Sequence, residues 1–85
     1  MKILVVEDTR SNAVLLREIL LRRGDNVVLA ESGAQALAAY SSAAPDLVLL
    51  DVVLPDMDGH AVARQIRQRE AAGRWTPIIF LSGLT

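Results

Sequence analysis

Three acidic side chains at the ends of two aliphatic runs are the residues of this sequence that could do chemistry together. Glu7 and Asp8 follow the run 3–6, and Asp51 follows the run 47–50. If these runs are neighbouring strands of a parallel sheet, about 4.8 Å separates their backbones, and the carboxylates share one pocket. Mutual repulsion at that range raises their pKa values unless a cation lies between them.

A hard divalent cation would neutralise this set of oxygen ligands. Mg²⁺ takes one or two carboxylates and keeps waters that exchange with phosphate oxygens, and Mn²⁺ is an alternative. A free carboxylate oxygen of Asp51 could then attack a phosphoryl group held by the same ion, which gives an aspartyl phosphate. Ser82 follows a further apolar run, 78–81, and could donate its hydroxyl to that phosphoryl group.

Alternating apolar runs and amphipathic segments predict the elements that position these side chains. Four aliphatic runs are expected to be strands, because each is short and ends at polar or turn residues: 3–6, 26–30, 47–50 and 78–81. Three intervening segments have capping residues and helical apolar spacing: Thr9, Ser11 or Asn12 to Arg23, Ser32 to Ala43, and His60 to Gly73. The alternation predicts an α/β fold, a doubly wound parallel sheet with helices on both faces.

The loop after Asp51 is expected to turn away from the pocket and leave this carboxylate open to solvent. Pro55 disfavours helix at Leu54, and Gly59 can adopt a positive φ. Trp75, in a later loop, is expected to pack that loop against the sheet. His60 and the arginines at 64, 67 and 69 are expected on the wet surface of a helix.

Composition and charge describe a single domain, residues 1–85. With 52% hydrophobic and 22% charged residues, the chain is too apolar to be disordered. A formal net charge of -1 provides no field that would draw nucleic acid or an anionic membrane. No cysteine is present, and the first apolar run is too short for a signal peptide or a membrane span, so we expect a cytoplasmic protein.

The motifs at three successive strand ends resemble those of the receiver domains of two-component response regulators. They are VVED at 5–8, DVVLPDMDG at 51–59 and TPIIFLSG at 76–83. The resemblance implies a flavodoxin-like receiver fold with strand order 2-1-3-4. Receivers continue through a further helix, strand and helix, so it also implies a receiver truncated after the fourth strand.

The resemblance implies a role for each residue of the acidic pocket. Asp51 would accept phosphate from a sensor histidine kinase or a histidine phosphotransfer protein. Asp8, Asp51 and the main-chain carbonyl of Val53 would ligate Mg²⁺, and Glu7 would act through a water. Ser82 takes the place of the family's switch hydroxyl. Receivers catalyse their own phosphorylation and dephosphorylation but are not otherwise enzymes.

One family residue has no counterpart in these 85 residues, namely the lysine at the end of the fifth strand that pairs with the phosphoryl group. The only lysine is Lys2, at the opposite end of the first strand. Losing this cation should make phosphorylation slow or absent. The fourth strand would also keep an unpaired edge, so we expect a homo-oligomer formed through it.

The sequence also predicts a docking surface on the first helix and the lifetime of a phosphate adduct. The helix after the first strand is more apolar than one buried stripe needs, and in the family this helix docks histidine-containing partners, so Leu15, Leu16 and Ile19 are candidates for docking. If Asp51 is phosphorylated, apolar Val53 and Leu84 offer little help in positioning an attacking water, and the adduct should be long-lived.

Two other classes of function compete with the phosphoacceptor hypothesis. A degenerate or truncated receiver could serve as a non-phosphorylated binding or oligomerisation module. An aspartyl-phosphate phosphatase of the haloacid dehalogenase type needs a second aspartate two residues after the nucleophile. Position 53 is valine, which excludes that class.

Overall fold

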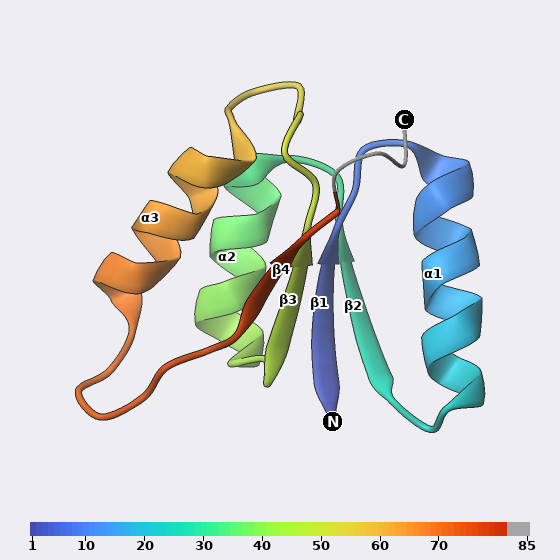
Figure 1. The fold of residues 1–85 in the computed structure, drawn as a ribbon, viewed down its shortest axis with the longest axis horizontal. Helices are drawn as coiled ribbons and strands as arrows, with labels where there is room; N and C mark the ends of the chain where they lie inside the picture. The colour runs from blue at the N-terminus through green and yellow to red at the C-terminus, as the bar shows by residue number, and fades with distance from the viewer. Residues whose placement is uncertain (82–85) are drawn as a thin grey trace.

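A parallel four-stranded sheet forms the centre of the computed structural model, which describes residues 1–81 (Figure 1). Its strand order is β2-β1-β3-β4, which confirms the expected order. The strands have these bounds: β1 Lys2–Val6, β2 Asn26–Ala30, β3 Leu47–Leu50 and β4 Ile78–Phe80. β1 and β3 are the two central strands, and Val6 pairs with Leu50 at their carboxyl ends.

Helices cover both faces of this sheet, which confirms the predicted doubly wound α/β fold. One face carries α1, and the other carries α2 and α3 (Figure 1). The helices have these bounds: α1 Arg10–Arg22, α2 Gly33–Ala43 and α3 Gly59–Arg69. None of the helices in residues 1–81 has the length and apolar character needed to cross a bilayer.

Both faces of β1 are buried. Leu4 and Val6 pack in the core beneath α2 and α3, whereas Ile3 and Val5 pack with Leu20 of α1. A central strand covered by helices on both faces must be apolar at every position. This is why the strand that carries Glu7 and Asp8 at its end reads as an unbroken aliphatic run.

α3 ends earlier than the sequence predicted. We expected the helix to reach Gly73, but its last residue is Arg69, and Glu70 is extended with φ -65° and ψ 137°. Glu70 leaves the helix because its carboxylate accepts hydrogen bonds from Arg67 Nη1 at 2.5 Å and from the Thr76 N–H at 2.8 Å. Contacts with the following segment therefore override the helical pattern of residues 70–73.

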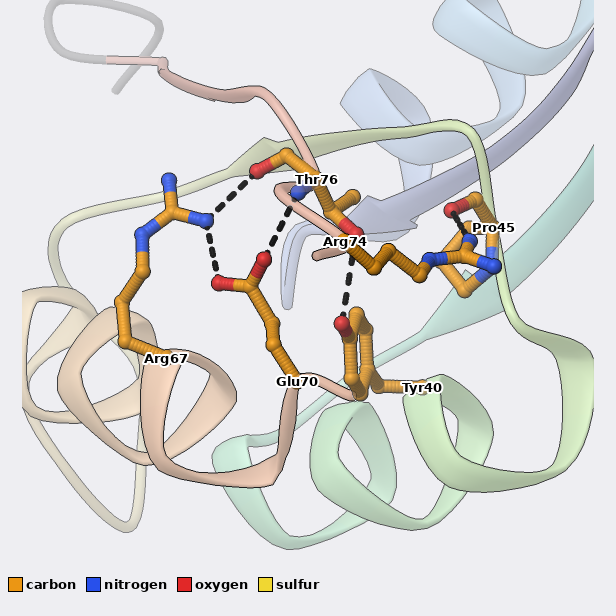
Figure 2. A network of polar contacts seen from close by, with 6 residues as sticks. All are labelled: Tyr40, Pro45, Arg67, Glu70, Arg74 and Thr76. Atoms are coloured by element: carbon orange, nitrogen blue, oxygen red, sulfur yellow. Dashed lines mark hydrogen bonds and ion pairs between the residues drawn. The ribbon is translucent and has the colours of Figure 1, made fainter. Parts of the chain in front are cut away.

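A polar network around Glu70 holds the connection between α3 and β4 (Figure 2). Arg67 Nη1 also donates to the Thr76 carbonyl at 2.7 Å, and the hydroxyls of Thr76 and Tyr40 lie 3.2 Å apart. Arg74 Nη2 donates to the Pro45 carbonyl at 2.7 Å. These bonds fix where β4 begins, so they also fix how its carboxyl end meets β3.

The predictions for Trp75, for Arg67 and for the end of β4 were wrong. Trp75 does not pack the loop against the sheet: its side chain is 67% exposed, and the Arg67 guanidinium lies over its ring at 4.5 Å. Arg67 is consequently not a plain surface arginine, because it binds Glu70, Thr76 and Trp75 at once. β4 also ends at Phe80, one residue before the expected end, although the Leu81 N–H still donates to the Leu50 carbonyl.

Candidate functional site

The carboxyl ends of β1 and β3 bring three acids together. The Asp51 N–H donates to the Val6 carbonyl at 2.9 Å, so the residues that follow the two strands start side by side. Carboxylate oxygens of Glu7, Asp8 and Asp51 all lie within 4.8 Å of one another. The expectation that these acids gather at one edge of the sheet is confirmed.

Burial makes this pocket electrostatically demanding. Glu7 is 0% exposed and Asp51 is 3% exposed, whereas Asp8 is open to solvent. The prediction that Asp51 is open to solvent was therefore wrong, because its side chain is enclosed between the ends of the two central strands. Within the part of the chain that the structure describes, Glu7 Oε2 and Asp51 Oδ2 are buried and have no hydrogen-bond partner. Two such carboxylates in close proximity require either a bound cation or a proton.

The second oxygen of Glu7 is hydrogen-bonded, and this contact only partly compensates the burial. Oε1 accepts the Thr9 N–H at 3.2 Å and Asn12 Nδ2 at 3.5 Å. Burial raises the pKa of Glu7, the bond from Thr9 lowers it in part, and the neighbouring Asp51 raises it further. The residues therefore fit a divalent cation, which would neutralise the charge that the protein leaves uncompensated.

The backbone after Asp51 passes very close to the start of α3. The Gly59 N–H donates to the Val52 carbonyl at 2.7 Å, and an added Cβ at Gly59 would lie 2.2 Å from the Asp51 carbonyl oxygen. The prediction that Gly59 adopts a positive φ was wrong, since among residues 1–81 only Gly24 and Gly73 are glycines with positive φ. Glycine is needed here for close approach of two backbone segments.

The remaining predicted site residues differ in how the structure places them. The Val53 N–H donates to Asp51 Oδ1 at 3.2 Å, so Val53 is at the pocket through its backbone. Leu15 and Ile19 are exposed on α1, but Leu16 is partly buried against the core cluster of Ile3, Val5 and Leu20. Leu16 is thus removed from the predicted docking surface, because the inward stripe of α1 includes it.

Ser82 and Leu84 lie outside the described residues, and the last described contact near them is the bond from Leu81 to β3. Lys2 lies at the opposite end of the sheet, where its Nζ donates to the Ala43 carbonyl at 2.9 Å. This contact agrees with the expectation that Lys2 does not serve the acidic pocket.

Asp56, the first of the two acids in LPDMDG, was not predicted to have a role. Its Oδ1 accepts the Gly33 N–H at 2.8 Å and its Oδ2 accepts the Ala34 N–H at 2.9 Å. These two bonds, Gly33 first, lower the pKa of Asp56 below its ordinary value. One feature of the sequence pointed to this contact: no acidic residue lies in the first turn of α2, although an anion is favourable there, so an acid from another segment could bind it.

Comparison with known proteins shows the family of this chain. The sequence profile of the response regulator receiver domain matches residues 3–85. The chain belongs to this family. Over 74 residues it is 39% identical to the chemotaxis protein CheY of Bacillus subtilis, an alignment that covers 86% of this chain and 62% of CheY. The receiver domain described here therefore spans less than two thirds of that relative.

Solved structures of receiver domains are similar as well. The CheY-like receiver domain of Methylobacillus flagellatus has a TM-score of 0.85 at 30% identity, over 94% of this chain and 67% of that one. The response regulator TrrA of Thermotoga maritima, in complex with Mg²⁺-BeF, has a TM-score of 0.78 at 39% identity, over 81% of this chain and 60% of that one.

Proposed function

We propose that this receiver domain accepts a phosphoryl group on Asp51, with Mg²⁺ in the acidic pocket. The observation that supports the proposal is a pair of buried carboxylate oxygens that have no hydrogen-bond partner within residues 1–81, namely Glu7 Oε2 and Asp51 Oδ2, beside exposed Asp8. An oxygen of Asp51 would attack the phosphorus of a phosphohistidine. The O–P bond forms as the N–P bond breaks, and the imidazole leaves with its electron pair and takes up a proton.

The chain's own residues have separate roles in this proposal. Asp8, Asp51 and the Val53 carbonyl would hold the ion, and Glu7 would act through a water. When bound, Mg²⁺ or Mn²⁺ neutralises the carboxylates and orients the phosphoryl oxygens. The hydroxyl of Ser82 would donate to one of these oxygens. The reaction is the domain's own phosphorylation, so we do not expect turnover of a free substrate.

The phosphodonor in this proposal is a sensor histidine kinase or a histidine phosphotransfer protein. The corrected docking surface consists of Leu15 and Ile19, which are exposed on α1, the helix that follows Glu7 and Asp8 in the chain. We expect no direct contact with nucleic acid. The cytoplasmic location stays a prediction from the sequence.

Incubation with Mg²⁺ and acetyl phosphate, followed by intact mass measurement, tests the proposal. The expected result is a phosphate adduct on the wild-type chain and none on Asp51→Asn. Asp46→Asn is the matched control, because Asp46 is an exposed acid at the opposite end of the sheet. Absence of an adduct on the wild-type chain after prolonged incubation would reject the proposal. Formation by these 85 residues, whose only lysine is the distant Lys2, should be slow, and the adduct should be long-lived.

A second candidate function is a binding or oligomerisation module that works without phosphorylation. Within residues 1–81, β4 pairs only with β3, and its Ile79 side chain is 53% exposed. An open strand edge with apolar side chains favours pairing with a second copy of the chain. Analytical ultracentrifugation at micromolar concentration should show self-association that Ile79→Lys weakens. A monomer in the wild-type chain would reject this candidate.

A further inference from the structure

The loop between β3 and α3 is hydrogen-bonded to the first turn of α2 through one carboxylate. Asp56 accepts the N–H groups of Gly33 and Ala34, one on each oxygen, at 2.8 Å and 2.9 Å. These partners lie 23 and 22 positions earlier in the chain. The contact therefore joins the segment that follows the candidate phosphoacceptor to an element distant from it in the sequence.

The Asp56 carboxylate accepts backbone N–H groups at the start of α2 that no residue of α2 accepts. The N-cap residue Ser32 accepts the Gln35 N–H on its Oγ at 3.2 Å, and no acidic residue lies in the first turn. The N–H groups of Gly33 and Ala34 have no intrahelical acceptor, because they belong to the helix start. A carboxylate between them satisfies both groups and also interacts favourably with the positive end of the helix dipole.

Side-chain packing supports the same contact independently. An added Cβ at Gly33 would lie 2.3 Å from Met57 Cγ and 2.6 Å from Met57 Sδ. Met57 therefore occupies the space that any larger residue at Gly33 would need. Asp56 and Met57 hold the loop on α2 by a polar and an apolar contact that are adjacent in the sequence.

The other parts of this loop are bonded to the acidic pocket. The Val53 N–H donates to Asp51 Oδ1, and Val53 pairs with Asp58 in an isolated antiparallel bridge. The Gly59 N–H donates to the Val52 carbonyl. Since Val53 and Asp56 belong to one short loop between fixed ends, a shift of the loop at Asp56 moves the backbone at Val53.

We propose that Asp56 is a positioning residue for the acidic pocket, acting through the backbone at Val53 and not by contact with the metal. This inference rests on the proposed function, in which the Val53 carbonyl is a ligand of Mg²⁺. With Asp56 bonded to α2, that carbonyl keeps one place relative to Asp51. Without the bond the loop has more conformations, and metal binding must order it.

Mg²⁺ titrations of the 85-residue chain, followed by the ¹⁵N–¹H signals of Val53 and Gly59, test the proposal. Asp56→Ala should weaken Mg²⁺ binding by roughly tenfold, the lower end of what loss of an outer partner of a metal site does. Asp56→Asn should weaken it less, because the amide keeps one of the two acceptors. Asp46→Ala is the matched control: this exposed acid also accepts a backbone N–H, from Lys2 at 2.7 Å, but at the opposite end of the sheet.

A metal-free measurement separates this inference from the proposed function. In the absence of Mg²⁺, hydrogen exchange at the Gly59 N–H should be faster in Asp56→Ala than in Asp46→Ala, and the Val53 amide signal should shift. If Asp56→Ala binds Mg²⁺ as tightly as Asp46→Ala, Asp56 only caps α2 and the inference is wrong. If the wild-type chain binds no Mg²⁺, the proposed function fails, and the metal-free comparison alone decides whether Asp56 orders the loop. Unchanged hydrogen exchange at the Gly59 N–H in Asp56→Ala would overturn the inference.

Discussion

Replacing Glu7 by glutamine should stabilise the metal-free chain. The carboxylate oxygens of Glu7 and Asp51 lie within 4.8 Å, so at an effective dielectric constant of about 20 their repulsion is about 3.5 kcal/mol. Glutamine removes this repulsion and keeps a carbonyl oxygen for the Thr9 N–H. Its amide group also offers a donor to the buried Asp51 Oδ2, which has no partner within residues 1–81.

The stabilisation should grow with pH. Burial first, and Asp51 in addition, raise the pKa of Glu7 above its ordinary value of 4.5, although the bond from Thr9 lowers it in part. A raised pKa means that the folded chain holds the proton more tightly than the unfolded chain. The contribution of Glu7 to stability is therefore complete below pH 4.5 and is lost as the pH rises through the folded-state pKa. Glutamine at position 7 does not ionise, so Glu7→Gln does not lose this stability as the pH rises.

Urea unfolding in the presence of EDTA, followed by far-ultraviolet circular dichroism, measures the effect. Circular dichroism is preferable to fluorescence because Trp75 is largely exposed in the folded chain. At about pH 8, Glu7→Gln should exceed the wild-type free energy of unfolding by about 1–3 kcal/mol, with the full Coulomb repulsion as upper limit. Mg²⁺ at about 100 times its Kd should stabilise the wild-type chain by about 2.7 kcal/mol and narrow the gap.

Asp46→Asn is the control for loss of one negative charge, since Asp46 is exposed and distant from the pocket. It should leave the response to Mg²⁺ unchanged. Equal or lower stability of Glu7→Gln relative to the wild type at pH 8, without metal, would show that the buried carboxylates do not repel one another. The pocket would then have no charge that a cation must neutralise.

Other substitutions test the packing of the loop and the network at the end of α3. Gly59→Ala should lower the free energy of unfolding by about 1–3 kcal/mol, because its Cβ would lie 2.2 Å from a backbone oxygen of Asp51. Gly33→Ala should cost less, since the Met57 side chain can rotate away, and equal urea midpoints for the two variants would contradict this difference. Burial raises the pKa of Glu70, but the hydrogen bonds from Arg67 and the Thr76 N–H outweigh burial, so the pKa of Glu70 is lowered from its ordinary value of 4.5. Ionised Glu70 therefore stabilises the folded chain above pH 4.5, and this contribution is lost as the pH falls through the folded-state pKa. Glu70→Gln should lower the free energy of unfolding by about 1–2 kcal/mol at neutral pH, and the two chains should become equally stable in acid. A difference in stability that persists at about pH 3 would refute the claim that ionised Glu70 stabilises the fold.

The strands and the gathering of the acids could be predicted from the sequence because both depend on local pattern. The runs 26–30 and 47–50 form strands with the predicted bounds. Aliphatic residues at every position identify strands that are buried on both faces. In a parallel sheet, the carboxyl ends of neighbouring strands meet at one edge, so acids that follow Val6 and Leu50 must come close.

Several errors share a physical cause, namely contacts between segments that are separated in the sequence. α3 stops at Arg69 because the carboxylate of Glu70 binds the Thr76 N–H. Gly59 is required by the approach of the Asp51 carbonyl, which no local turn preference reveals. Leu16 faces the core because α1 lies over one face of the sheet, which decides how wide its buried stripe is.

The sequence by itself determined the order of elements, the family and the three acids at the strand ends, because each is written in residues that are adjacent or regularly spaced. Only the tertiary structure decided which carboxylate oxygens are buried without a partner among residues 1–81, and which backbone N–H groups Asp56 binds. Those properties depend on α2 packing beside the loop that follows β3, and Asp56 lies 22 positions after Ala34 in the chain. Distances between such segments arise from the packing of the whole sheet and its helices, so no local pattern encodes them.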